Sequence, residues 1–118
     1  MSKIIIVVNP DENILIMIRT ILEKENYDVI TAKDNNECIE KCNTIRPDLI
    51  FLPIISKGPL PKEIAQRLND VKIIYLTKVK LTKKEKLELI EEKGNPVDII
   101  NYPLNPSRLL FYVNKYVN

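Results

Sequence analysis

The sequence predicts an α/β protein of three layers, in which a parallel sheet of five strands lies between two layers of helices. Short runs of β-branched residues, of which residues 4–8 are the first, are typical of strands buried on both faces of a parallel sheet. These runs alternate with longer segments of helical periodicity. Strands that are joined through helices run parallel to one another, and right-handed crossovers place the helices on both faces of the sheet.

Five apolar runs are expected to form the strands. The third run contains Pro53, which interrupts the strand because proline has no amide hydrogen. The expected strands comprise residues 4–8, 27–32, 49–55, 72–77 and 97–101. Functional residues of such a sheet gather beyond the carboxyl ends of the strands, near the point where the strand order reverses.

Five helices are expected between and after the strands. Asp34 or Asn35 can cap the second helix, and the Arg46-Pro47 step stops it, because a residue that precedes proline avoids the helical conformation. The third helix opens in the loop of residues 57–61. The expected helices comprise residues 12–25, about 35–45, about 61–69, 83–93 and 106–118.

The last two helices carry signals at their ends. Thr82 and Glu85 have the spacing of a capping box, in which the hydroxyl and the carboxylate bind free amide groups of the first turn. Gly94 is a suitable terminator, because glycine adopts positive φ without strain. Asn105 and Pro106 are typical of a helix start.

Composition indicates one ordinary globular domain over residues 1–118, with 45% hydrophobic and 29% charged residues. The net charge of +2 is too small to argue for a nucleic acid or an anionic membrane as partner. No apolar run approaches the roughly 20 residues that span a bilayer. The first apolar run is too short for a secretory signal, so a cytoplasmic location is expected.

The chain contains no histidine, which excludes histidine metal ligands, histidine general bases and catalytic triads. Cys38 and Cys42 lie four residues apart on an expected helix. A disulfide within one helical turn is poorly oriented. We therefore expect two small side chains that face the core, with a redox switch as the alternative.

Several stretches together resemble the response-regulator receiver (CheY-like) family over nearly the whole chain. The similar stretches are residues 5–8, 11–15, 21–29, 46–50, 73–77 and 102–106. The resemblance implies the flavodoxin/CheY-like fold, a doubly wound (βα)5 unit whose five-stranded parallel sheet has the order 2-1-3-4-5.

The resemblance also implies a reaction, the transfer of a phosphoryl group to an aspartate at the end of the third strand. In the family an acidic pair after the first strand holds Mg²⁺, a hydroxyl ends the fourth strand, and a lysine before a proline ends the fifth. Here the acidic pair falls on Asn9 and Pro10, the acceptor on Pro53 and the lysine on Tyr102. Only Thr77 is retained.

These departures predict a receiver that has lost its aspartate chemistry. Proline cannot be phosphorylated, and the pocket offers no carboxylate to a metal ion, so we expect no metal, no cofactor and no catalysis. Asp11, Asp48 and Asp98 are the nearest possible substitutes. Asp11 lies past the position of the acidic pair, and the other two lie early in their strands, so we expect structural roles for all three.

Three further positions bear on the switch that the resemblance implies. The usually small residue after Thr77 is Lys78, and the position of the switching aromatic residue is Ile99. The chain therefore lacks both the phosphoryl group that would trigger the two-state change and the aromatic side chain whose rotation would report it. The Tyr102-Pro103 bond is expected to be cis, as in the family.

Two surfaces are candidates for binding a partner. Residues 78–86 contain five lysines and one glutamate, and cations at a helix start oppose the helix dipole. In the last helix Leu109, Leu110, Val113 and Val117 are expected to face inward, which leaves Phe111 and Tyr112 largely outside. Ile16, in the first helix, is expected in the core, with an exposed contact position as the alternative. The alternatives are a merely solvated lysine cluster and packing of the two aromatic residues against a neighbouring helix.

We expect a phosphorylation-independent docking or dimerisation module. In the family the face of helix 4, strand 5 and helix 5 is the common dimer surface, so a protein partner or a second copy is expected there. Nucleic acid is not expected, because no aromatic residues lie among the lysines. The expected contact residues are Lys80, Lys83, Lys84, Phe111, Tyr112 and Lys115.

Two alternatives remain open for the function. One is a receiver that is phosphorylated at a non-standard residue, in a phosphorelay. The other is a small-molecule binder that uses the vacated pocket, with Asn9 and Tyr102 as its polar groups.

Overall fold

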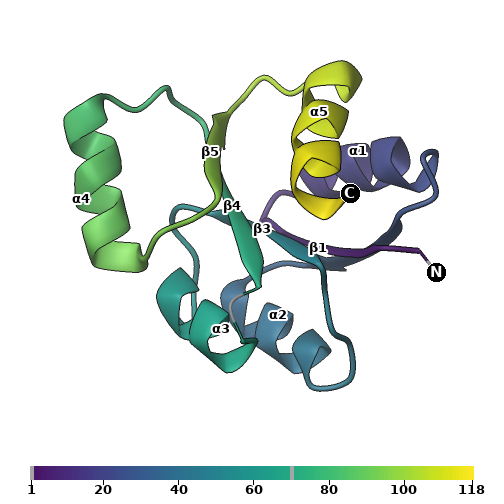
Figure 1. Cartoon of the computed structure of the whole chain (residues 1–118), viewed down its shortest axis with the longest axis horizontal. Helices are drawn as coiled ribbons and strands as arrows, with labels where there is room; N and C mark the ends of the chain where they lie inside the picture. Colours follow the sequence, from purple (N-terminus) through teal and green to yellow (C-terminus); the bar gives the residue numbers. More distant parts are fainter. Residues whose placement is uncertain (1, 70) are drawn as a thin grey trace.

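The computed structural model describes residues 2–69 and 71–118 and confirms the predicted sheet. All strands run parallel, in the order β2-β1-β3-β4-β5 (Figure 1). The strands are β1 Ile4–Val8, β2 Asp28–Ala32, β3 Leu49–Pro53, β4 Lys72–Thr77 and β5 Asp98–Asn101.

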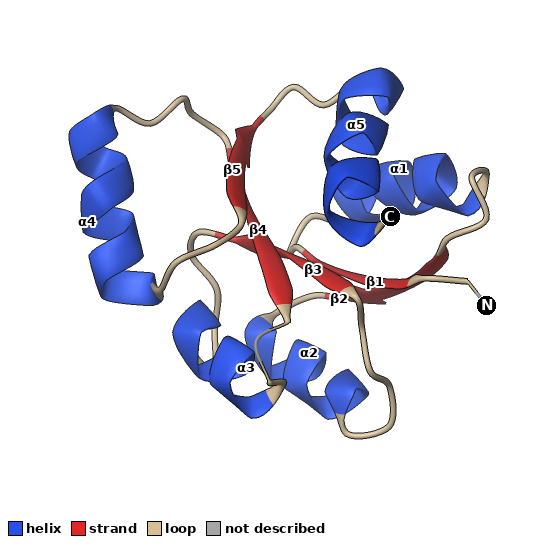
Figure 2. Ribbon diagram, viewed as in Figure 1, coloured by secondary structure: helices blue, strands red, loops and turns tan. Residues whose placement is uncertain are grey.

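A helix follows each strand, which gives three layers (Figure 2). The helices are α1 Glu12–Glu23, α2 Asn35–Cys42, α3 Pro61–Arg67, α4 Lys83–Lys93 and α5 Pro106–Val117. Helices α1 and α5 cover one face of the sheet, whereas α2 and α3 cover the other, and α4 lies beyond β5 at the edge. None of the helices, over the residues described, is long and apolar enough to cross a membrane.

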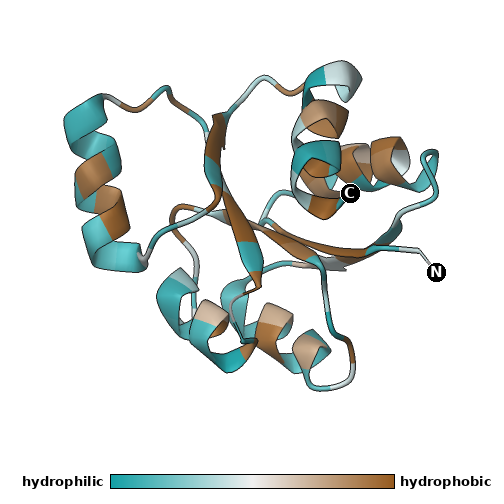
Figure 3. Ribbon diagram, in the orientation of Figure 1, coloured by the Kyte–Doolittle hydropathy of each residue, from teal (hydrophilic) through white to brown (hydrophobic). Residues whose placement is uncertain are grey.

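Each face of the sheet has its own apolar core, because successive side chains of a strand point to opposite faces. Figure 3 shows the strands as the most apolar part of the chain. The core under α1 and α5 includes Ile5, Val7, Ile18, Phe51, Leu109 and Val113. The core under α2 and α3 includes Ile6, Val8, Cys38, Ile64, Tyr75 and Leu89.

The predicted signals at the start of α2 and at both ends of α4 are confirmed. Asp34 caps α2, and its carboxylate accepts a bond of 2.9 Å from the Glu37 amide. The Thr82 hydroxyl accepts from the Glu85 amide at 3.2 Å, and the Glu85 carboxylate accepts from the Thr82 amide at 3.0 Å. Gly94 ends α4 with a φ of 107°.

Several element ends were predicted too far along the chain, among them the end of α3, which lies at Arg67. Strand β3 ends at Pro53, and Ile55, predicted in the strand, is 83% exposed. Helix α1 ends at Glu23, before Asn26 turns the chain with a φ of 65°. Helix α2 ends at Cys42, where the amides of Asn43 and Thr44 form turn bonds to the carbonyls of Glu40 and Lys41. Apolar residues continue past the end of β3 (Ile54 and Ile55) and of α2 (Ile45), whereas the backbone conformation does not.

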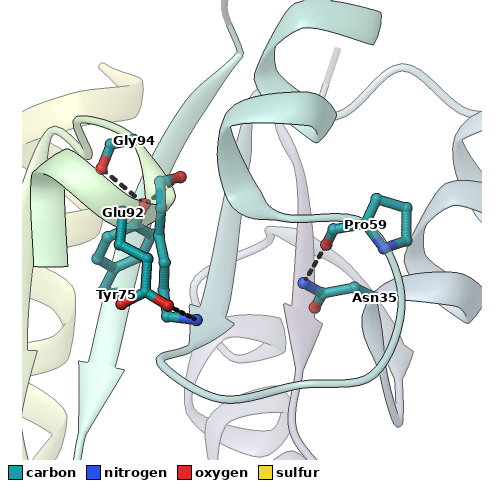
Figure 4. A network of polar contacts seen from close by, with 6 residues as sticks. Asn35, Pro59, Tyr75, Glu92 and Gly94 are labelled. Carbon is teal, nitrogen blue, oxygen red and sulfur yellow. Dashed lines mark hydrogen bonds and ion pairs between the residues drawn. The ribbon is translucent and has the colours of Figure 1, made fainter.

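Two buried polar contacts join loops to the framework (Figure 4). The Tyr75 hydroxyl donates to the Gly94 carbonyl at 2.8 Å, which attaches the end of α4 to β4. The Asn35 side chain donates through Nδ2 to the Pro59 carbonyl at 2.9 Å. The second bond holds the start of α2 against the loop between β3 and α3.

Candidate functional site

The five residues of the predicted vacated pocket follow or end the strands at the carboxyl edge of the sheet. Asn9 follows β1 and is buried, and Pro10 beside it is exposed. Pro53 ends β3 and is half-buried, Thr77 ends β4 and is buried, and Tyr102 follows β5. Hydrogen bonds join Asn9, Thr77 and Tyr102 directly, so the structure brings these three together.

Both polar atoms of the Asn9 side-chain amide form hydrogen bonds within the protein. Its Nδ2 donates to the Tyr102 hydroxyl at 3.2 Å, and its Oδ1 accepts from the Asp11 amide at 2.9 Å. The first bond links β1 to the end of β5, and the second shapes the turn into α1. Asn9 therefore stabilises the edge of the sheet without offering a charged oxygen to a ligand.

Tyr102 supplies no cation at the position where the resemblance implies a lysine. Burial raises the pKa of its phenol to about 12, and the nearby charge of Asp11 acts in the same direction. The phenol is therefore neutral at physiological pH. Its backbone amide donates to the Thr77 carbonyl at 2.9 Å, and the Tyr102-Pro103 bond is cis, as predicted.

The Thr77 hydroxyl is also bonded internally. It accepts from the Val79 amide at 2.9 Å and donates to the Val79 carbonyl. Thr77 is only 3% exposed. The hydroxyl that the resemblance implies for contact with a phosphoryl group thus holds the turn after β4.

The three aspartates considered as substitutes all bind the backbone, in agreement with the structural roles predicted. Asp11 caps α1 through the Asn13 amide at 2.9 Å. Asp48 accepts from the Ile4 amide at 2.8 Å, and Asp98 accepts from the Ile99 amide at 2.8 Å. Among residues 2–69 and 71–118, histidine, cysteine and acidic side chains form no group of three or more that could hold a metal ion.

A cavity of about 470 Å³ lies beside this edge and was not predicted from the sequence. It is lined by Pro10, Lys33, Asp34, Ile55, Ser56 and Lys57. Neither Asn9 nor Tyr102 lines it, and their polar groups bind each other. Asn9 lines a second cavity, of about 320 Å³, but Tyr102 lines neither of the two. The small-molecule hypothesis used both residues as polar groups of one pocket, so the geometry does not favour it.

The two cysteines lie where the core-facing interpretation placed them. Cys38 is buried and Cys42 is half-buried, and both thiols are free. Burial raises the pKa of Cys38 and of Cys42. A raised pKa lowers the thiolate fraction and with it the reactivity.

The predicted contact residues on α4 and α5 are largely exposed. Lys80, Lys83, Lys84 and Lys115 are exposed, and Phe111 is 62% exposed. The structure describes two ion pairs, Arg19 with Glu23 and Lys93 with Glu92, and neither involves these lysines. The ammonium group of Lys115 lies 5.2 Å from the centroid of the Tyr116 ring.

Two predictions about apolar side chains need correction. Tyr112 is half-buried rather than largely outside, because it packs against the core under α1 and α5. Its ring contacts Phe111 edge to face, with 5.3 Å between the centroids. Ile16 was predicted in the core but is 56% exposed. Sequence reasoning also missed Leu87 on α4, which is 61% exposed although its neighbour Leu89 is buried.

Comparison with known proteins finds similar sequences and many similar structures. No family model matches the chain. The alkaline phosphatase synthesis transcriptional regulatory protein PhoP of Bacillus subtilis (strain 168) is 38% identical over 79 residues. The match covers 64% of this chain but only 31% of PhoP, so the chain corresponds to a part of that protein.

The similar structures share the fold at low sequence identity. The chemotaxis protein CheY4 of Vibrio cholerae has a TM-score of 0.83 at 21% identity, with 98% of this chain and 99% of that chain covered. The receiver domain of NtrX from Brucella abortus gives 0.82 at 22%, covering 96% and 97%. A CheY-like receiver domain protein of Methanospirillum hungatei JF-1 gives 0.85 at 22%, covering 99% and 94%. These likenesses confirm the predicted fold.

Proposed function

We propose that this chain, a CheY-like response-regulator receiver domain by its fold and by its match to PhoP, acts in signal transduction through protein contacts that need no phosphorylation. The observation that carries this proposal is the chemistry of the carboxyl edge of the sheet. Asn9, Pro10, Pro53 and Tyr102 supply no carboxylate and no cation there.

The remaining polar groups at this edge are already bonded within the protein. Asn9 binds Tyr102 and the Asp11 amide, and the Thr77 hydroxyl binds Val79. A hard cation such as Mg²⁺ requires carboxylate or carbonyl oxygens that are free to coordinate it. Both phosphorylation and its metal cofactor therefore lack their ligands, and we do not assign an enzymatic activity to the domain.

Contacts with a partner are proposed on the face of α4, β5 and α5. The exposed lysines before and in α4 give this face positive charge, and Phe111 gives it an exposed aromatic ring. Large exposed apolar side chains rimmed by charges are typical of protein contact sites. A cytoplasmic location is part of the same proposal.

The proposal is tested by treating the chain with Mg²⁺ together with acetyl phosphate or beryllofluoride. We expect unchanged amide resonances and an unchanged intact mass. A receiver domain that retains its acceptor aspartate, treated in parallel, controls for the reagents. A phosphoryl adduct, or saturable shifts at Asn9, Thr77 and Tyr102, would contradict the proposal and support phosphorylation at another residue.

The contact face is tested with a matched pair of substitutions. Phe111 and Ile16 are both large, apolar and exposed, at 62% and 56%, but they lie on α5 and α1 respectively. Phe111→Ala should weaken complex formation in the native cell, whereas Ile16→Ala should not. Equal effects of the two substitutions would show that the contact lies elsewhere.

A further inference from the structure

The cavity of about 470 Å³ beside the carboxyl edge of the sheet has no part in the proposed function. Its walls come from the turn after β1, which supplies Pro10, from Lys33 and Asp34 between β2 and α2, and from residues 55–57 after β3. Small-molecule sites are typically preformed hollows of roughly 300–1,000 Å³ that combine apolar walls with a few polar groups. The cavity has this size, so the rigidity and the chemistry of its walls decide what it can hold.

Hydrogen bonds of Asn35 hold the loop after β3 in place beside the cavity. The Asn35 amide donates to the Lys57 carbonyl and to the Ser56 hydroxyl, each at 3.0 Å. Its side chain donates through Nδ2 to the Pro59 carbonyl at 2.9 Å (Figure 4). Asn35 itself is only 2% exposed. This wall of the cavity is therefore formed before a ligand arrives, which lowers the entropic cost of binding.

The charged groups that line the cavity favour an anion with a single charge. Lys33 and Lys57 are exposed, and neither takes part in the ion pairs that the structure describes. The Asp34 carboxylate caps α2 by accepting from the Glu37 amide at 2.9 Å. Two cations and one carboxylate give the lining a net charge of +1, which suits a carboxylate better than a phosphate monoester of about −2. Lys33 also lines the second cavity beside Glu12 and Glu37, so Lys57 is expected to contribute more.

Ile55 and Pro10 give the cavity an apolar surface. Ile55 is 83% exposed and belongs to neither core of the sheet, so packing within the domain does not explain it. We propose that this cavity binds a small organic monocarboxylate with an apolar body. The carboxylate pairs with Lys57 and Lys33, and the apolar body covers Ile55 and so removes its surface from water. This site goes beyond the proposed function and does not depend on it.

The test is a titration of the full chain with octanoate and with phenylbutanoate at low salt, followed through the backbone amide resonances. We expect saturable shifts of the amides of residues 33–35 and 55–58. Octylamine has an equally apolar body but the opposite charge, so it should bind about tenfold more weakly than octanoate. The proposal is overturned if neither carboxylate gives saturable shifts at these amides, or if octylamine binds as tightly as octanoate.

Matched substitutions of exposed residues separate the site from general effects of charge and hydrophobicity. Lys57→Gln should weaken octanoate binding about threefold and K33Q/K57Q about tenfold, whereas Lys41→Gln on α2 should leave it unchanged. Ile55→Ala should also weaken it, and Ile16→Ala should not. Lys57→Glu changes the net charge of the lining from +1 to −1, so octylamine should become the better ligand.

Folding is controlled by the melting temperature of each variant, which should stay close to that of the wild type because the substituted side chains are exposed. Equal effects of Lys57→Gln and Lys41→Gln would overturn the proposal, as would a preference for octanoate that survives Lys57→Glu. These titrations are independent of the phosphodonor test, so an empty cavity leaves the proposed function intact.

Discussion

The attachment of α4 to the sheet can be tested by removing one oxygen atom. The hydroxyl of Tyr75, a residue only 1% exposed, donates to the Gly94 carbonyl at 2.8 Å and lies 3.3 Å from the Lys93 carbonyl. Tyr75→Phe keeps the ring and its packing but removes this bond. Since a part-buried carbonyl then loses its donor, we expect the free energy of unfolding to fall by about 1–2 kcal/mol at pH 7.

The pH dependence of this effect follows from the ionisation of Tyr75. Burial raises its pKa to about 12, above an ordinary value of about 10. A phenol with a raised pKa contributes its stability in full below pH 10, and this stability is lost as the pH rises through 12. Two pKa units correspond to about 3 kcal/mol. Tyr75→Phe has no such group, so the difference between wild type and variant should shrink between pH 10 and 12.

Urea unfolding followed by circular dichroism at pH 7 and at pH 11.5 measures both effects. Tyr112→Phe is the matched control, because the structure describes no hydrogen bond of the Tyr112 hydroxyl and its loss should change little. A Tyr75→Phe variant as stable as the wild type at pH 7 would refute the role of the bond. A difference that stays constant up to pH 12 would refute the ionisation argument.

Three further predictions concern the cap of α4, the loop after β5 and the cysteines. Thr82→Ala removes the cap and should lower the free energy of unfolding by about 1 kcal/mol, whereas the exposed Thr20→Ala should change it by less than about 0.5 kcal/mol. Since its bonds to Thr82 lower the pKa of Glu85, the contribution of the cap should fade as the pH drops through that pKa. Arg108 donates to the carbonyls of Asn101 and Pro103 at 2.5 and 3.0 Å, so Arg108→Ala should shift the urea midpoint by the equivalent of about 2 kcal/mol. Arg19→Ala, which breaks an exposed pair with Glu23, should cost about 0.5 kcal/mol or less. Iodoacetamide at pH 8 should alkylate Cys42 before Cys38, both more slowly than in urea, and rapid alkylation of both in the native protein would contradict their burial.

Much of the fold could be predicted because its signals are local. Caps such as Asp34 and Thr82 act on amides within three residues, and Gly94 adopts its positive φ by itself. Because the apolar runs alternate with helical segments, they also predicted a parallel sheet. The order of the strands came from the resemblance to receivers, and the structure confirms it.

The errors occurred where packing decides the outcome. Ile16 was expected in the core, yet it is 56% exposed. Tyr112 was expected largely outside, yet it is half-buried and packs against the core under α1 and α5. Helical periodicity places a residue on one side of a helix, but it does not say how far the neighbouring helix covers that side.

The features of the candidate site could likewise be predicted only in part. The sequence alone determined that Asn9, Pro10, Pro53 and Tyr102 bring no carboxylate to the edge of the sheet, because the type of a side chain does not depend on the fold. Only the tertiary structure decided that Asn9 binds Tyr102, 93 residues away, and that the Thr77 hydroxyl is held by Val79. Local interactions depend on neighbours in the chain and can be read from it, whereas the pairing of distant polar groups depends on how sheets and helices pack.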